Sequence, residues 1–404
     1  MSKQKFDPEE ISNFLTEQRD EASAEVQPVF LDFEDLWERK LWHQLTERLL
    51  EFFASKDSSA LRLPLYNKFI LSFADKINQL KLVKLALAAS HEIEGGFRID
   101  GKRVLQLTKC IEDEERAEFL ETLQKRVNKP EFEEAHTYAT TELASVYLGL
   151  DEESKAREQL DTAQTTLDRF DFVENIVHAS FYRVNAEYYQ TREDFTSYYR
   201  NSLLYLACVD ASELSPKERQ QRAYNLALAA LVSDQIYNFG ELLLHPILDS
   251  LKPPHTQSWL RDLLFAFNRG DLATFDRLSN NLSKNKILDE HKVFLYQKIS
   301  LAALTELVFR RPPHDRAMTF QTISQETKVK PNEIEHLLMK ALSLGLLRGK
   351  IDQVDEVARI NWVQPKVLER SQIEGMRQRL KEWDSNVNDL GHWIEDQGKD
   401  VWAS

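Results

Sequence analysis

Glycine and proline are scarce in this chain of 404 residues, which contains 11 glycines and 12 prolines. Glycine makes up about 3% of the residues, against roughly 7% in an average protein. An all-β sandwich or barrel needs many tight turns, and a phosphate-binding loop needs several glycines close together. The shortage argues against both and favours a mainly helical protein. Hydrophobic residues amount to 42%, enough to bury a sizeable core, so we expect a folded chain.

Cysteines and long apolar runs are also few. The two cysteines, Cys110 and Cys208, form neither a C-x-x-C motif nor a disulfide framework, which fits a reducing compartment. No run approaches the roughly 18 apolar residues of a membrane-spanning helix. The start, MSKQKFDPEEISNFL, lacks the apolar core of a signal peptide. We therefore expect a soluble protein of the cytoplasm and nucleus that has no membrane partner.

An excess of positive charge is missing as well, because the formal net charge is −14. A surface that follows nucleic-acid phosphates needs clustered lysine and arginine. The composition therefore argues against a nucleic-acid partner.

The familiar motifs of catalysis are absent. The chain has no G-x-x-x-x-G-K-[ST], no G-x-G-x-x-G and no G-x-S-x-G, and the fragment GLLRGK at 345–350 has the wrong spacing for a phosphate loop. The ten histidines form no H-E-x-x-H and no H-x-H pair that would bind zinc. We expect no catalytic residue, no cofactor and no metal, and hence a protein that is not an enzyme.

Helical periodicity is what the sequence has in abundance. Residues 1–30 are polar, with a few apolar residues that would line one short amphipathic helix: Phe6, Ile11, Phe14 and Leu15. From residue 31 on, apolar residues recur every three or four positions, and the stripe from Leu36 to Phe52 predicts one face of a helix. Between Pro130 and Leu307, apolar stripes alternate with short polar breaks, which is typical of stacked helical hairpins.

The residue pattern changes after the proline pair Pro312–Pro313, which would end a helix and marks a boundary between two parts of the chain. A short helix with Phe320 and Ile323 facing inward is followed by a second helix that starts near Pro331 and ends near Gly345. The segments LLRGKI and VARINWV then read as two strands joined by the polar link DQVDE. Helix, turn, helix and a two-stranded wing make a winged helix. Its second helix, which would read DNA, carries Glu333 and Glu335, so we expect protein contact there instead.

The last 40 residues contain one heptad pattern. Apolar residues are spaced alternately by three and four, as in a coiled-coil seam, and the residues between them are mostly polar. A terminal helix of this kind must bury its seam against another helix. The seam residues, which we expect to form a protein interface, are Ile373, Met376, Leu380, Trp383, Val387, Leu390 and Ile394.

The segment KISLAALTELVFRRPPHDRAMTFQTISQETKVKPNEIEHLLMKALSLGLLRGKIDQVDEVARINWVQPKVL resembles the PCI module. Subunits of the proteasome lid, the signalosome and translation initiation factor three share that module. Over its whole length, and most specifically in ARINWVQPKVL and MRQRLKEWDSNVNDLGHWIED, the chain resembles the non-ATPase regulatory subunit 13 family of the 26S proteasome regulatory particle. The resemblance implies an α-solenoid of helical hairpins, a winged-helix (PCI) domain and a C-terminal heptad helix. We expect these parts at 1–30 (polar segment), 31–170 (N-terminal repeats), 171–312 (repeats of the PCI module), 313–364 (winged helix) and 365–404 (bundle helix).

The resemblance also implies a function. Such chains are non-catalytic scaffold subunits of the lid that support its assembly and ubiquitin-dependent degradation. Their winged helices associate edge to edge with those of other PCI subunits, their terminal helices form one bundle, and deubiquitinating lid subunits lie nearby. We expect the winged-helix edge to use Leu346, Ile351, Val357 and Ile360. The alternatives are a PCI subunit of the signalosome or of the initiation factor, a winged-helix nucleic-acid adaptor of the kind used in RNA export, and an enzyme with an unrecognised site.

Overall fold

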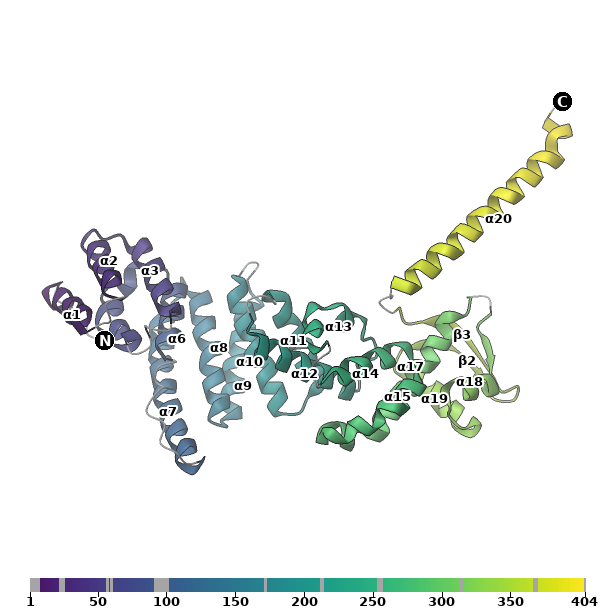
Figure 1. The fold of residues 1–404 in the computed structure, drawn as a ribbon, viewed down its shortest axis with the longest axis horizontal. Helices are drawn as coiled ribbons and strands as arrows, with labels where there is room; N and C mark the ends of the chain where they lie inside the picture. Colours follow the sequence, from purple (N-terminus) through teal and green to yellow (C-terminus); the bar gives the residue numbers. More distant parts are fainter. Residues whose placement is uncertain are drawn as a thin grey trace. The chain divides into compact units, whose positions relative to one another are not determined.

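The computed structural model describes residues 8–21, 26–55, 58, 61–90, 102–170, 173–210, 214–252, 257–312, 315–365 and 370–402. Phe6, a residue of the predicted first helix, lies outside these ranges. Within the ranges, the side chains of Pro8, Glu21, 102–113, 370–372, Gly375, Arg379 and 398–402 are not described, and Cys110 is among them. The chain divides into two compact units, Met1–Asp210 and Ala211–Ser404. Both are mainly helical, as the shortage of glycine predicted (Figure 1). The boundary expected after residue 170 lies inside the first unit, between two helical hairpins.

All the secondary structure in the described residues of the first unit is helical. Helix α1 holds the predicted apolar residues Ile11, Phe14 and Leu15, all buried. Its helical segments are α1 (Pro8–Glu21), α2 (Gln27–Glu38), α3 (Trp42–Ala54), α4 (Arg62–Pro64), the π-helical η2 (Leu65–Ile70), α5 (Leu71–Phe73), the 3-10 turn η3 (Ala74–Lys76), α6 (Gln79–Ser90), α7 (Lys102–Val127), α8 (Glu133–Gly149), α9 (Glu153–Leu167), α10 (Asn175–Thr191) and α11 (Phe195–Cys208).

The prediction of a single helix from Leu36 to Phe52 was wrong. The stripe runs across two helices, α2 and α3, because the chain turns at Lys40, whose φ is 57°. A turn of this kind usually carries glycine, and neither glycine nor proline stands here to announce it. The apolar spacing continues through the turn because both helices pack on the same core.

Four turns between consecutive helices share one backbone geometry. In each, a residue with φ between 57° and 66° follows the helix end, and the next N–H donates to the carbonyl five residues earlier. This is the bonding of the Schellman motif, which satisfies carbonyls that the helix end leaves free. These four hairpins therefore leave the first helix in the same way. The left-handed residues are Lys40, Asp151, Glu193 and Gly270, and the N–H donors are Leu41, Glu152, Asp194 and Asp271.

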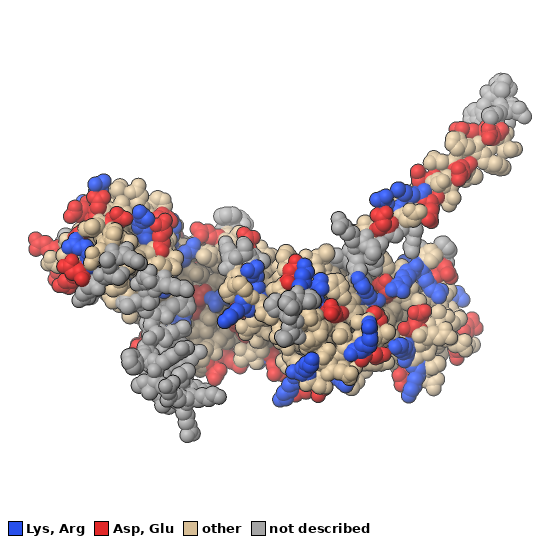
Figure 2. Space-filling view, viewed as in Figure 1, with Lys and Arg blue, Asp and Glu red and all other residues tan. Residues whose placement is uncertain are grey.

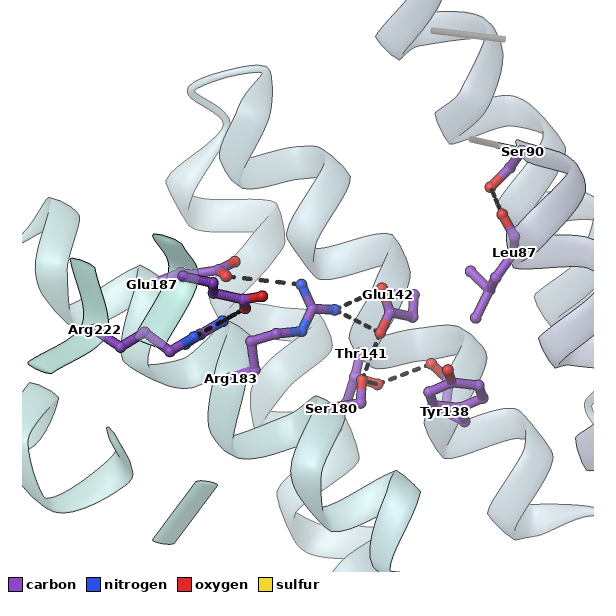
Figure 3. A network of polar contacts seen from close by, with 10 residues as sticks. Leu87, Ser90, Tyr138, Thr141, Glu142, Ser180, Arg183, Glu187 and Arg222 are labelled. Atoms are coloured by element: carbon purple, nitrogen blue, oxygen red, sulfur yellow. Dashed lines mark hydrogen bonds and ion pairs between the residues drawn. The ribbon is translucent and has the colours of Figure 1, made fainter. Parts of the chain in front are cut away.

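A buried polar network fixes α8 against α10 in the first unit (Figure 3). Nη2 of Arg183 lies 2.7 and 2.8 Å from the two carboxylate oxygens of Glu142, and the Ser180 hydroxyl donates to the same carboxylate at 2.7 Å. The Thr141 hydroxyl lies 3.0 Å from that of Ser180. Burial lowers the pKa of Arg183, but the carboxylates of Glu142 and Glu187 outweigh it and raise that pKa above its usual value. The arginine therefore stays charged, and its fork sets one register between the two helices.

The second unit begins with further helical repeats. Gly270, between α14 and α15, approaches α17 so closely that a Cβ there would lie 2.5 Å from Cα of Ala303. The repeat segments are α12 (Pro216–Val232), α13 (Gly240–Leu244), the 3-10 turn η5 (Pro246–Leu251), α14 (Ser258–Arg269), α15 (Leu272–Leu278), the 3-10 turn η6 (Ser279–Lys284), α16 (Lys286–Glu290) and α17 (Lys292–Arg310).

A buried lysine joins α17 to the end of α12. Lys298 is 1% exposed, and its Nζ donates to the carbonyl oxygens of Ala230, Leu231 and Ser233 at 2.8, 3.0 and 2.6 Å. The aromatic rings of Tyr237, Phe239 and Phe294 surround the same nitrogen at 5.3 to 5.6 Å. Desolvation lowers the pKa of Lys298 to about 7, against a smaller opposing effect of Asp234. The carbonyls at the end of α12 thus receive donors from a side chain on α17.

The winged helix is built on α17. Leu301, Leu304 and Val308 of α17 share one core with the winged-helix residues. Its elements are β1 (Ala317–Thr319), α18 (Phe320–Thr327), α19 (Pro331–Ser343), β2 (Leu347–Asp352) and β3 (Val357–Val363), and the long helix α20 (Arg370–Trp402) follows. The three antiparallel strands have the order β1-β3-β2.

The predicted helices and strands of the winged helix are confirmed. Phe320 and Ile323 are buried, Pro331 lies in the first turn of α19, and Gly345 follows that helix with a φ of 69°. The sequence did not indicate β1, because a three-residue strand is too short to show alternation.

Candidate protein–protein interface

Helix α20 carries the predicted heptad seam. It is one helix of 33 residues, about 50 Å long at 1.5 Å per residue. Successive seam residues lie three or four positions apart, so they form one stripe along the helix. All the seam residues are between 46% and 66% exposed: Ile373, Met376, Leu380, Trp383, Val387, Leu390 and Ile394.

Exposure of this stripe is energetically unfavourable in water. Fully burying a leucine or methionine side chain contributes about 1.5 to 3 kcal/mol. Trp393, next to Ile394 and 61% exposed, widens the apolar surface. It lies outside the heptad positions, so the seam pattern does not indicate it. The opposite side of the helix is polar, with Gln378, Ser385 and His392 at the farthest heptad position. The helix therefore offers one apolar face for association with another helix.

The four predicted residues of the winged-helix edge lie in or against the core of that domain. Leu346 and Ile360 are 4% and 3% exposed, and Ile351 packs partly buried against the same core. Val357 is half-buried in β3, the central strand, where both neighbours already pair with it. A partner strand could therefore pair only with the backbone of β2 or β1, and contact through these four side chains stays a prediction.

The second winged-helix helix, α19, presents acidic groups as the sequence predicted. Glu333 is exposed in its first turn, and Oε2 of Glu335 accepts a hydrogen bond of 3.0 Å from Gln353 in the turn between β2 and β3. Lys340 at the other end donates to Gln297 of α17 at 3.5 Å. Nucleic-acid phosphates would meet carboxylates where a reading helix normally enters the groove.

Over the described residues, no group of three His, Cys, Asp or Glu side chains could hold a metal ion. No helix of the described chain is long and apolar enough to cross a membrane.

The fold and the exposed helix together define the class: helical repeats that end in a winged helix and a long terminal helix. Three family models match this arrangement. One described as PSD13 N-terminal repeats matches residues 29–264, one described as PCI domain matches residues 268–362, and one described as Rpn9 C-terminal helix matches residues 366–398.

Curated relatives match over nearly the whole chain. The probable 26S proteasome regulatory subunit rpn9 of Schizosaccharomyces pombe is 40% identical over 97% of this chain and 98% of its own length. The 26S proteasome regulatory subunit RPN9 of Saccharomyces cerevisiae is also 40% identical, over 98% of this chain and all of its own. The eukaryotic translation initiation factor 3 subunit M of Dictyostelium discoideum is 24% identical over only 44% of each chain.

This chain therefore belongs to the family of 26S proteasome regulatory subunits that includes RPN9 and non-ATPase regulatory subunit 13. The likeness over the full length favours this family over the alternatives of a signalosome subunit and an initiation-factor subunit. The predicted PCI domain and mainly helical fold class are confirmed.

Proposed function

We propose that this chain is a non-catalytic scaffold subunit of the lid of the 26S proteasome regulatory particle, where it supports lid assembly and ubiquitin-dependent protein degradation. The part of this proposal that names the assembly is supported by the membership of the chain in the RPN9 family. The observation that carries the mechanism is the exposed apolar seam of α20.

Helix α20 acts as the assembly element. Its seam binds the terminal helices of other PCI-type lid subunits in a bundle, which removes the apolar residues from water. Because the seam runs along a helix of 33 residues, one chain can contact several partner helices at once. The helical repeats, braced by polar networks such as Glu142–Arg183, supply a rigid surface.

The winged helix supplies a second contact. The outer edge of β2 presents backbone N–H and C=O groups that a strand of a neighbouring winged helix can pair with. Two contacts on one chain fix its orientation in the lid, which in turn helps to place the deubiquitinating subunits nearby. The chain itself does not cut ubiquitin chains, and it acts in the cytoplasm and nucleus, where the particle works.

Affinity purification of the tagged chain from its own cells, followed by mass spectrometry, tests the proposal. We expect proteasome lid subunits in stoichiometric amounts. Recovery of signalosome or initiation-factor subunits in their place would refute it. Incubation of the purified chain with ubiquitin chains should leave them uncut, and cleavage that persists through repurification would refute the scaffold role.

A further inference from the structure

The outer face of the winged-helix sheet carries three cations and one tryptophan. Arg348 and Lys350 of β2 are exposed, as is Arg359 of the central strand β3. Lys350 pairs directly with Arg359 in the strand register, and Arg348 pairs with Trp362. Figure 2 shows a group of Lys and Arg atoms along the upper edge of this domain.

These cations lack neutralising partners within the described part of the chain. None of the three has a carboxylate oxygen within the 4.0 Å that defines an ion pair. The next residue of β2 on this face, Asp352, instead accepts a hydrogen bond of 3.2 Å from the N–H of Asp355 in the wing turn. Lys350 and Arg359, as directly opposed residues in antiparallel strands, hold like charges close together, an arrangement that disfavours the sheet. In a chain of net charge −14, a face with three cations and one carboxylate, that of Asp352, is an exception.

A β-bulge places the tryptophan on this face. The strand register shifts between Arg348 and Gly349, so that Asn361 has no partner and Trp362 points to the same side as Arg348. Without the bulge, strict alternation would turn Trp362 toward the core, on the side of Ile360. Gly349 permits the bulge, because a Cβ at that position would overlap the carbonyl oxygen of Arg359. The guanidinium of Arg348 then lies 4.6 Å from the centre of the Trp362 ring.

We propose that this face, formed by Arg348, Lys350, Arg359 and Trp362, binds an acidic segment of a partner protein. Carboxylates of the segment pair with the three cations, and an apolar part of it packs on the half-buried indole. Carboxylates of the segment offset the repulsion between Lys350 and Arg359, so the two cations have a lower electrostatic energy with the segment bound than in water alone. This surface is distinct from the seam of α20 and from the edge of β2.

An acidic protein segment fits the face better than a nucleic acid. The wing turn beside it carries exposed Asp355 and Glu356, and α19 exposes Glu333. A duplex presents one charge every 1.7 Å or so along its axis and would meet those carboxylates beyond the small cationic area. A peptide of a few acidic residues can lie on the cations alone.

Fluorescence anisotropy of the full chain with a fluorescein-labelled octaglutamate peptide at low salt tests the proposal. We expect saturable binding that weakens as salt is raised. The double variant K350E/R359E should weaken it at least about tenfold, while R359K should retain it. In K350E/R359E the opposed residues still carry like charges, so the fold faces the same repulsion as before.

The matched control K284E/K292E makes the same change of net charge at exposed lysines outside the sheet. It should bind the peptide like the unaltered chain. Equal loss in this control, or no binding of the peptide by the unaltered chain, would overturn the proposal. So would tighter binding of labelled single-stranded RNA or duplex DNA that depends on Lys350 and Arg359.

Discussion

The Nζ atom of Lys298 lies 2.6 Å from the carbonyl oxygen of Ser233, and the same nitrogen reaches two more carbonyls at the end of α12. The protonated amine can donate to all three acceptors at once, and the neutral amine can donate to two of them. The lysine thereby ties α12 to α17, the helix on which the winged helix is built.

Replacing Lys298 by methionine should lower the free energy of unfolding by about 2 to 4 kcal/mol, because carbonyls at a buried helix end lose their donors. Methionine fills most of the volume, so loss of packing contributes little. Urea unfolding followed by tryptophan fluorescence measures the change. The matched variant Lys292→Met, at an exposed position in the same helix, should have almost no effect.

Stability should also depend on pH through Lys298. Its pKa is lowered to about 7 in the folded chain, and an unfolded lysine has a pKa of about 10.4. Between these values the unfolded state binds more protons, so the free energy of unfolding rises with pH by up to about 1.4 kcal/mol per unit. Relative to Lys298→Met, the unaltered chain should therefore gain stability from pH 7 to pH 9. If the difference in free energy of unfolding between the two chains stays constant from pH 7 to pH 9, the pKa of Lys298 is not lowered in the folded chain.

The left-handed turn residues predict opposite effects of glycine. Glu193→Gly should stabilise the chain by up to about 1 kcal/mol, because an exposed glutamate there holds a φ of 58° that glycine adopts without strain. Gly270→Ala should destabilise it by about 1 to 3 kcal/mol, since the new Cβ would both occupy a left-handed conformation and meet Ala303. Thermal unfolding of the two variants gives the comparison. If both variants shift the unfolding temperature in the same direction, glycine does not have the same effect in the two turns.

The opposed cations of the wing sheet predict a gain in stability when one is neutralised. Lys350→Gln should raise the free energy of unfolding by about 0.2 to 1 kcal/mol, because it removes a like-charge pair across β2 and β3. Lys292→Gln, the same change on a helix surface, should stay within about 0.5 kcal/mol of zero. Urea unfolding at low salt measures both, and high salt should reduce the difference. If Lys350→Gln destabilises the chain, the two side chains do not repel each other.

Much of the fold could be predicted from periodicity, because most helices here bury one face in the core of their own unit. The winged helix was also readable, since Pro331 and Gly345 stand where a helix begins and ends. The turn at Lys40 was not predicted. The polar breaks predicted the turns at Asp151 and Glu193, but not which residue is left-handed, because ordinary residues stand there in a conformation that glycine normally signals. The contact between Lys298 and the end of α12 spans more than 60 residues, and no local pattern indicates it.

The two candidate interfaces differ in how far the sequence predicts them. The seam of α20 follows from spacing alone, because a heptad needs no tertiary information. The side chains proposed for the winged-helix edge were harder, since alternation shows two faces but not which one is covered by α17; Leu346 and Ile360 lie on the covered side. Trp362 could not be placed at all, because a bulge between Arg348 and Gly349 reverses the face on which it lies.

The most direct test of the scaffold role is incorporation of a seam variant into the lid. In Leu380→Asp with Leu390→Asp, two exposed leucines of the seam become charged. Losing their burial in a bundle should cost about 3 kcal/mol or more, which weakens association by about a hundredfold or more. The control Gln378→Asp with Ser385→Asp places two carboxylates on the opposite side of α20. Circular dichroism should show both variants folded. On native gels of cells expressing each variant as the only copy, we predict that the seam variant is left out of the lid and the control enters it; normal incorporation of the seam variant would contradict the account.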